Sequence, residues 1–223
     1  MSVIVVGGNI GLGKTTTAKL LGDYFKSDVF FENVDDNKIL PLFYEADEAE
    51  QERKRYPFLL QLTFLSSRFE IIKEALVDDD NIMDRSIYED WYFAKVNHDL
   101  GRIADVEFKI YESLLNNMME ELDELPKKSP DLMVYLEGSF ETMIKRIRLR
   151  GRDFEQDDKL MNYYYTLWEG YDDWVDNSYD ASQVIKFNMD EIDVVNNPED
   201  GKYLCEAVDK KLKEIRADYN VTK

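Results

Sequence analysis

The chain has 223 residues, a hydrophobic fraction of 44% and a formal net charge of −19 at pH 7. This length and apolar content suit one α/β domain with a full core, and no apolar run is long enough to cross a membrane. Duplex nucleic acids are bound largely through Lys and Arg, so the acidic charge argues against a nucleic-acid partner and favours a small substrate.

The N-terminus and the single cysteine bear on the cellular compartment. The N-terminus has no basic leader, and a cleaved signal peptide would remove the motif that directly follows its apolar stretch. Cys205 alone cannot form an intrachain disulfide. We therefore expect a cytoplasmic protein with a single domain over residues 1–223.

Apolar and β-branched runs alternate along the chain with longer segments of helical periodicity. The predicted strands are residues 3–6, 29–31, 81–83, 132–136 and 184–187. The predicted helices are residues 13–26, 56–77, 86–99, 105–125, 140–150, 160–176 and 199–217. This order predicts a doubly wound α/β fold, in which helices flank a five-stranded parallel sheet. The charged segment 45–55 is expected to be a solvated helix or a surface loop.

The most informative motif lies between the first predicted strand and the first predicted helix. Residues 8–15 read Gly-Asn-Ile-Gly-Leu-Gly-Lys-Thr and match the phosphate loop Gly-x-x-x-x-Gly-Lys-Thr. Its glycines allow backbone N–H groups to surround phosphate oxygens at the positive end of the next helix. Lys14 is expected to reach the β- and γ-phosphates of ATP or GTP, and Thr15 to ligate Mg²⁺. The expected phosphate-binding residues are Gly8, Asn9, Ile10, Gly11, Leu12, Gly13, Lys14, Thr15 and Thr16.

A second cluster, Asp84-Arg85-Ser86, ends the third predicted strand and opens a helix. Asp84 is expected to hold Mg²⁺ or its water ligands opposite the phosphate loop. Ser86 and Glu89 have the spacing of a capping box, so Ser86 is expected only to cap the helix. Asp84 and Arg85 could form a plain ion pair, but beside a phosphate loop we favour a functional role.

Five segments of the chain resemble the deoxynucleoside kinases, in particular the bacterial deoxyadenosine and deoxyguanosine kinases. These segments are residues 3–16, 31–44, 61–68, 83–94 and 146–156, and they follow the order of the family. The resemblance implies transfer of the γ-phosphoryl group of ATP to the 5′-hydroxyl of a 2′-deoxynucleoside, with Mg²⁺, by a homodimer. Overall likeness favours deoxyadenosine as the substrate, with deoxyguanosine and deoxycytidine as alternatives.

The resemblance also assigns catalytic roles. Glu32, at the end of the second predicted strand, matches the general base of the family, and desolvation by the two preceding phenylalanines is expected to raise its pKa. Arg85 matches an arginine that contacts this base and the 5′ end of the substrate. The basic segment becomes an arginine-rich lid at about residues 146–156, in which Arg146, Arg150 and Arg152 would contact the phosphates. The expected catalytic residues are Glu32, Arg85, Lys14, Arg146 and Arg150.

Substrate selection is expected to depend on a further set of side chains. Gln61 and Arg68 are seven residues apart and share a helical face. With Asp90 they match the residues that read the base in the family, where thymidine-preferring members carry apolar residues in place of the last two. Arg68 and Asp90 could instead form a purely structural ion pair. Tyr44 and Glu155 resemble the pair that holds the 3′-hydroxyl.

The sequence is also compatible with three alternative functions. A nucleoside monophosphate kinase of the thymidylate kinase type would share the phosphate loop, the lid arginines and the Asp-Arg pair, but it would not need a base such as Glu32. A non-catalytic nucleotide-binding accessory subunit could be built on the same fold. A GTPase switch is disfavoured because the sequence contains no guanine-reading Asn-Lys-x-Asp motif.

Overall fold

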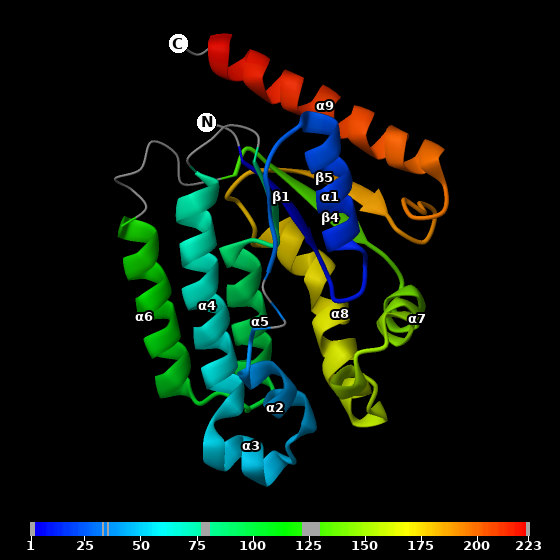
Figure 1. The fold of residues 1–223 in the computed structure, drawn as a ribbon. Helices are drawn as coiled ribbons and strands as arrows, with labels where there is room; N and C mark the ends of the chain where they lie inside the picture. The colour runs from blue at the N-terminus through cyan, green and yellow to red at the C-terminus, as the bar shows by residue number, and fades with distance from the viewer. Residues whose placement is uncertain (1–2, 33, 35, 77–80, 122–129, 222–223) are drawn as a thin grey trace.

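The computed structural model of the chain, shown in Figure 1, describes residues 3–32, 34, 36–76, 81–121 and 130–221. Five strands form one parallel sheet in the order β2-β3-β1-β4-β5. The strands are β1 (Val3–Gly8), β2 (Val29–Phe30), β3 (Asn81–Asp84), β4 (Leu132–Glu137) and β5 (Gln183–Asn188). This sheet confirms the predicted doubly wound fold.

Helices cover both faces of the sheet. Their bounds are α1 (Lys14–Phe25), α2 (Ile39–Glu45), α3 (Glu48–Lys54), α4 (Tyr56–Ala75), α5 (Ile87–Asp99), α6 (Asp105–Glu121), α7 (Phe140–Arg150), α8 (Met161–Asn177) and α9 (Pro198–Val221). Helices α1 and α9 pack together against one face, and α4, α5 and α8 lie on the other (Figure 1). Because both faces are covered, β1, β3 and the first five residues of β4 are buried, which explains why these strands are continuous apolar runs. None of the described helices has the length and apolar character needed to cross a bilayer.

Two short helices follow β2, where the sequence predicted less structure. Helix α2 was not predicted. Helix α3 lies within the charged segment 45–55 and has no buried residue, in agreement with the solvated helix that was one of the two expectations. The ends of two predicted helices, residue 77 and residues 122–125, lie outside the described residues.

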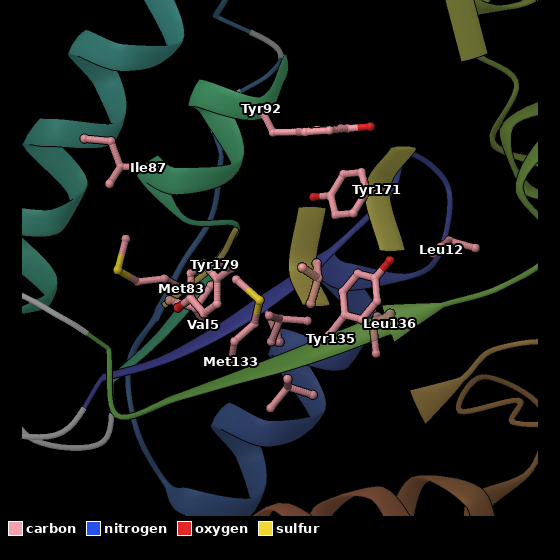
Figure 2. Packing of buried hydrophobic residues seen from close by; sticks show 14 of the residues in the cluster. Val5, Leu12, Met83, Ile87, Tyr92, Met133, Tyr135, Leu136, Tyr171 and Tyr179 are labelled. Atoms are coloured by element: carbon pink, nitrogen blue, oxygen red, sulfur yellow. The ribbon is translucent and has the colours of Figure 1, made fainter. Parts of the chain in front are cut away.

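An aromatic cluster fixes α5 and α8 to the sheet. Figure 2 shows Tyr171 of α8 between Tyr92 of α5 and Tyr135 of β4. The ring centroid of Tyr171 lies 4.8 Å from that of Tyr92 and 5.8 Å from that of Tyr135. Large aromatic rings bury much apolar area and stack in preferred geometries, so this cluster holds α5 and α8 in register above the strands.

Candidate functional site

A cavity of about 780 Å³ lies at the carboxyl ends of β1, β2 and β3, which is the edge where parallel α/β sheets bind ligands. Most of the predicted site residues line it, namely Ile10, Gly11, Gly13, Lys14, Thr15, Thr16, Glu32, Tyr44, Gln61, Asp84, Arg85, Asp90, Arg146, Arg150, Arg152 and Glu155. Gly8, Asn9, Leu12 and Arg68 do not line it.

The phosphate loop, residues 8–15, turns sharply between β1 and α1. Gly8, Gly11 and Gly13 have positive φ angles of 140°, 80° and 97°, a region that side-chain-bearing residues rarely adopt. A β-carbon on Gly8 would also lie 2.6 Å from the carbonyl oxygen of Leu136. The loop therefore requires glycine, and α1 begins at Lys14 with its N-terminus at the cavity.

Lys14 extends back across the loop, where its Nζ donates to the carbonyl oxygen of Asn9 at 2.9 Å. Burial and the neighbouring Arg85 lower the pKa of this ammonium group to about 7, although Asp84, Glu89 and Glu32 act in the opposite direction. A lysine that loses its charge near neutral pH regains it when an anion binds beside it. The position therefore favours phosphate binding.

The two predicted metal ligands lie in contact. The Oγ1 of Thr15 donates to Oδ2 of Asp84 at 2.6 Å. A hydroxyl and a carboxylate at the end of a phosphate loop supply the hard oxygen donors that Mg²⁺ prefers, together with phosphate oxygens and water. The donor set therefore fits a magnesium ion.

Arg68 is buried beside the cavity and contacts two of its lining residues, Glu32 and Asp90. Its Nη2 donates to Oε1 of Glu32 at 2.8 Å, its Nε to Oδ2 of Asp90 at 3.0 Å, and its Nη1 to the carbonyl oxygen of Asp84 at 2.8 Å. The side chain is only 2% exposed. One guanidinium group thus joins the ends of β2 and β3 to α5.

Glu32 stands two residues after β2, and four cations, Arg85, Arg68, Lys14 and Arg152, act on its carboxylate. Burial alone would raise the pKa of its carboxyl group, but Arg85, Arg68 and Lys14 outweigh burial and hold the pKa below its ordinary value. Desolvation acts in the expected direction, but the expected net rise of this pKa was wrong, because the sequence does not show that the arginines converge on the carboxylate. Glu32 is therefore ionised at neutral pH and able to accept a proton.

Arg85 follows β3 in the left-handed region, with a φ of 80°. Its guanidinium group lies over the ring of Phe93, 4.5 Å from the centroid, and its Nε is 3.9 Å from Oε1 of Glu32. The buried Nη1 has no hydrogen-bond partner among the described residues. This atom lies 3.9 Å from Oε1 of Glu89.

The lid arginines are already paired. Arg150 donates to Oε2 of Glu155 from Nε at 3.1 Å and from Nη2 at 2.6 Å, and Arg152 Nη1 lies 3.5 Å from Oε1 of Glu155. Arg146 donates to the carbonyl oxygen of Leu12 in the phosphate loop at 3.0 Å. Gly151 ends α7 with a φ of 69°. The structure thus brings the basic segment to the phosphate loop.

Gln61 and Tyr44 line the remaining wall. Gln61 is almost fully buried, and its Oε1 has no hydrogen-bond partner within the part of the chain that the structure describes. The ring of Tyr44 stacks on that of Phe154 with a centroid distance of 5.7 Å, next to the segment that contains Glu155. The pair expected to hold a sugar hydroxyl therefore lies on one wall.

Glu89 is the residue that the sequence reasoning missed. The expected capping box is present, but the carboxylate of Glu89 also accepts a hydrogen bond from the Gly8 N–H at 3.0 Å. The two residues are 81 positions apart. No local pattern could have indicated this contact, because capping explains both Ser86 and Glu89 without it.

Comparisons with known proteins identify relatives of this chain. The family model described as deoxynucleoside kinase matches residues 4–213. A deoxyguanosine kinase of Lactobacillus johnsonii is 45% identical over 218 residues, covering 96% of this chain and 94% of the relative. A deoxyadenosine kinase of Lactobacillus acidophilus is 42% identical, covering 96% and 98%.

Solved structures show the same relationship. A deoxyadenosine kinase from M. mycoides with bound dCTP superposes with a TM-score of 0.74 at 28% identity, covering 96% of this chain and 100% of that one. The family model spans most of the chain, and the relatives exceed 40% identity over nearly its whole length. The chain belongs to the deoxynucleoside kinase family.

Proposed function

We propose that the protein transfers the γ-phosphoryl group of ATP to the 5′-hydroxyl of a purine 2′-deoxynucleoside. The observation that carries this proposal is that one cavity has a phosphate loop at one end and an ionised carboxylate between two arginines at the other. Phosphoryl transfer needs the donor phosphate and the acceptor hydroxyl to be aligned, with cations on the transferred group and a base on the acceptor. This cavity supplies each of these elements.

Glu32 would accept the proton of the 5′-hydroxyl. Its lowered pKa keeps the carboxylate ionised at neutral pH, which is the form that accepts a proton. Arg85, which lines the cavity 3.9 Å from Glu32, would donate to the acceptor or to the transferred phosphoryl group. Arg68 would hold the carboxylate in place through the 2.8 Å hydrogen bond.

At the donor end, the phosphate loop and Lys14 would bind the β- and γ-phosphates. Thr15 and Asp84 would hold Mg²⁺, which when bound neutralises charge on the phosphate oxygens. Arg146, Arg150 and Arg152 would contact the donor phosphates from the lid, about residues 146–156. The pairing of Arg150 with Glu155 would then exchange for phosphate contacts when the donor binds.

Selection of the nucleoside would depend on Gln61 and Asp90, which line the cavity, with Arg68 holding Asp90 in place and Tyr44 and Glu155 at the sugar. The unpartnered Oε1 of Gln61 is a buried acceptor, and it suits the N–H groups on the edge of adenine or guanine. Deoxyadenosine is the acceptor expected from the sequence. The relatives named deoxyguanosine kinase and deoxyadenosine kinase support both purines as substrates.

A homodimer and a cytoplasmic location are also part of the proposal. Val106, Ile110 and Leu114 of α6 are 65%, 48% and 37% exposed and repeat every four residues, so they form one apolar stripe. A second copy of the chain could bury this stripe. Light scattering should therefore report twice the mass of one chain, and replacement of all three residues by Ser should give a monomer. A wild-type monomer would contradict this part of the proposal.

The acceptor is tested by measuring phosphate transfer from MgATP to four deoxynucleosides and to their monophosphates. We expect kcat/KM for deoxyadenosine or deoxyguanosine to exceed that for thymidine by roughly 100-fold or more, because an unmatched base would leave buried polar groups unpaired. The monophosphates should be inert. If only a monophosphate reacts, the protein is a nucleoside monophosphate kinase, and if no acceptor supports ATP turnover, it is an accessory subunit.

The pKa of Lys14 predicts a pH dependence of MgATP binding. Above about pH 7 the Lys14 side chain of the unliganded protein is a neutral amine, and it must take up a proton when phosphate binds. Below that pH it is already charged. The dissociation constant for MgATP should therefore rise with pH above about 7, by at most roughly tenfold for each pH unit. Calorimetry in two buffers of different ionisation enthalpy should show proton uptake at about pH 8.

Lys14→Arg is the matched control for this experiment, because its guanidinium group stays charged throughout the range. The difference between wild type and this variant removes any proton that the ligand itself releases. Equal proton uptake by the two proteins at about pH 8 would show that Lys14 is not the titrating group.

A further inference from the structure

Glu89 is a fully buried carboxylate that lies behind the cavity wall and does not line it. It occupies the third position of α5, where its Oε2 accepts the N–H of Ser86 at 2.8 Å and completes the capping box. A glutamine at this position would serve the cap equally well. The cap alone therefore does not explain a buried charge with 0% exposure.

The other carboxylate oxygen joins two more segments. Oε1 accepts the N–H of Gly8 at 3.0 Å and also the hydroxyl of Tyr171 in α8. Arg85 Nη1 lies 3.9 Å from the same oxygen. A buried carboxylate is tolerated only when it is paired and hydrogen-bonded. Three donors and a guanidinium group meet this requirement and fix the carboxylate in one orientation.

Glu89 accepts hydrogen bonds from two backbone N–H groups that flank the cavity, those of Gly8 and Ser86. Gly8 begins the phosphate loop, and a β-carbon on the preceding Gly7 would lie 3.3 Å from both oxygens of Glu89, so β1 passes close to the carboxylate. On the other side, Arg85 holds a left-handed backbone conformation with a φ of 80°. Such a conformation in a residue other than glycine persists only when its surroundings hold it.

Arg85 is held from both sides. Its own N–H donates to the carbonyl oxygen of Val6 in β1 at 3.0 Å, and the N–H of the next residue, Ser86, donates to Glu89. The carboxylate of Glu89 therefore connects β1 to the strained turn at the end of β3. Any displacement of that turn moves the guanidinium group of Arg85 relative to Glu32 and the phosphate loop.

We propose that Glu89 is a positioning residue for phosphoryl transfer, which fixes Arg85 and the first N–H of the phosphate loop relative to each other. Tyr171 acts with it by holding Oε1 in the required orientation. Glu89 does not reach the cavity, so it acts through Arg85 and not on the substrate itself. The activity readout of this inference rests on the proposed kinase function.

Glu89→Gln tests the proposal because it keeps the size of the side chain and one acceptor oxygen for the cap, while it removes the charge and the second acceptor. We expect kcat to fall roughly 10- to 100-fold, since a displacement of about 1 Å in a catalytic group has an effect of this order. The KM values for nucleoside and ATP should stay within about threefold, because the residues that line the cavity are unchanged.

Tyr171→Phe provides a second, milder variant, which remains informative if Glu89→Gln does not fold. It removes only the hydroxyl that orients Oε1, so kcat should fall by a smaller factor, again with KM nearly unchanged. The double variant should be no slower than Glu89→Gln alone, because residues that act as one unit are not additive. Multiplicative losses would show that the two residues act independently and would contradict the coupled role.

Val208→Ala is the control for lost stability. Val208 is fully buried in α9, which lies on the other face of the sheet from α5 and α8. This variant should lower Tm while kcat per folded molecule stays at the wild-type value. If Glu89→Gln behaves in the same way, with kcat per folded molecule within twofold of wild type, Glu89 is only a structural cap and the proposal is overturned.

The backbone amide resonance of Gly8 gives a readout that does not depend on activity. In ¹⁵N-labelled protein this resonance should shift in Glu89→Gln and in Tyr171→Phe, and it should not shift in Val208→Ala. An unchanged resonance in Glu89→Gln would overturn the proposed link to the phosphate loop. If the wild-type protein phosphorylates no deoxynucleoside, the proposed function fails, and the amide resonance still decides whether Glu89 holds the loop.

Discussion

The guanidinium group of Arg68 is the interaction on which the site depends. It is buried, and its three nitrogens donate to a carboxylate after β2, a backbone carbonyl at the end of β3 and a carboxylate on α5. An arginine is suited to this task because its planar group is always charged and presents several donors in fixed directions. If Arg68 were removed, Asp90 would remain as a buried carboxylate without its ion-pair partner, which is strongly unfavourable, and Glu32 would lose its 2.8 Å hydrogen bond.

The same network sets the electrostatics of the cavity. Arg85 and Lys14 lie close enough to Glu32 to hold its pKa low, while Arg85 and burial lower the pKa of Lys14 to about 7. The cavity therefore keeps an ionised carboxylate at Glu32 and a readily recharged amine at the phosphate loop. Charges that are fixed before the substrate binds need not reorganise during the reaction, and this preorganisation is a large part of the catalytic effect in phosphoryl transfer.

Local patterns in the sequence were sufficient to predict the strands, the phosphate loop and the cap at Ser86, because each depends on neighbouring residues. Helix α2 was not predicted, since it is short and only Leu40 and Phe43 are buried. The predicted direction of the Glu32 pKa shift was wrong, because the shift depends on arginines that are far away in the chain. The contact between Glu89 and Gly8 was missed for the same reason.

The central claim is that Glu32, held by Arg68, accepts the proton of a deoxynucleoside 5′-hydroxyl. The most direct measurement is kcat of Glu32→Gln together with its dissociation constants for MgATP and for the nucleoside, with Glu74→Gln as a control carboxylate that lines the same cavity outside the arginine cluster. The account predicts that kcat falls by roughly 10²- to 10⁴-fold, while both dissociation constants stay near their wild-type values and Glu74→Gln keeps full activity. Wild-type kcat in Glu32→Gln would contradict it.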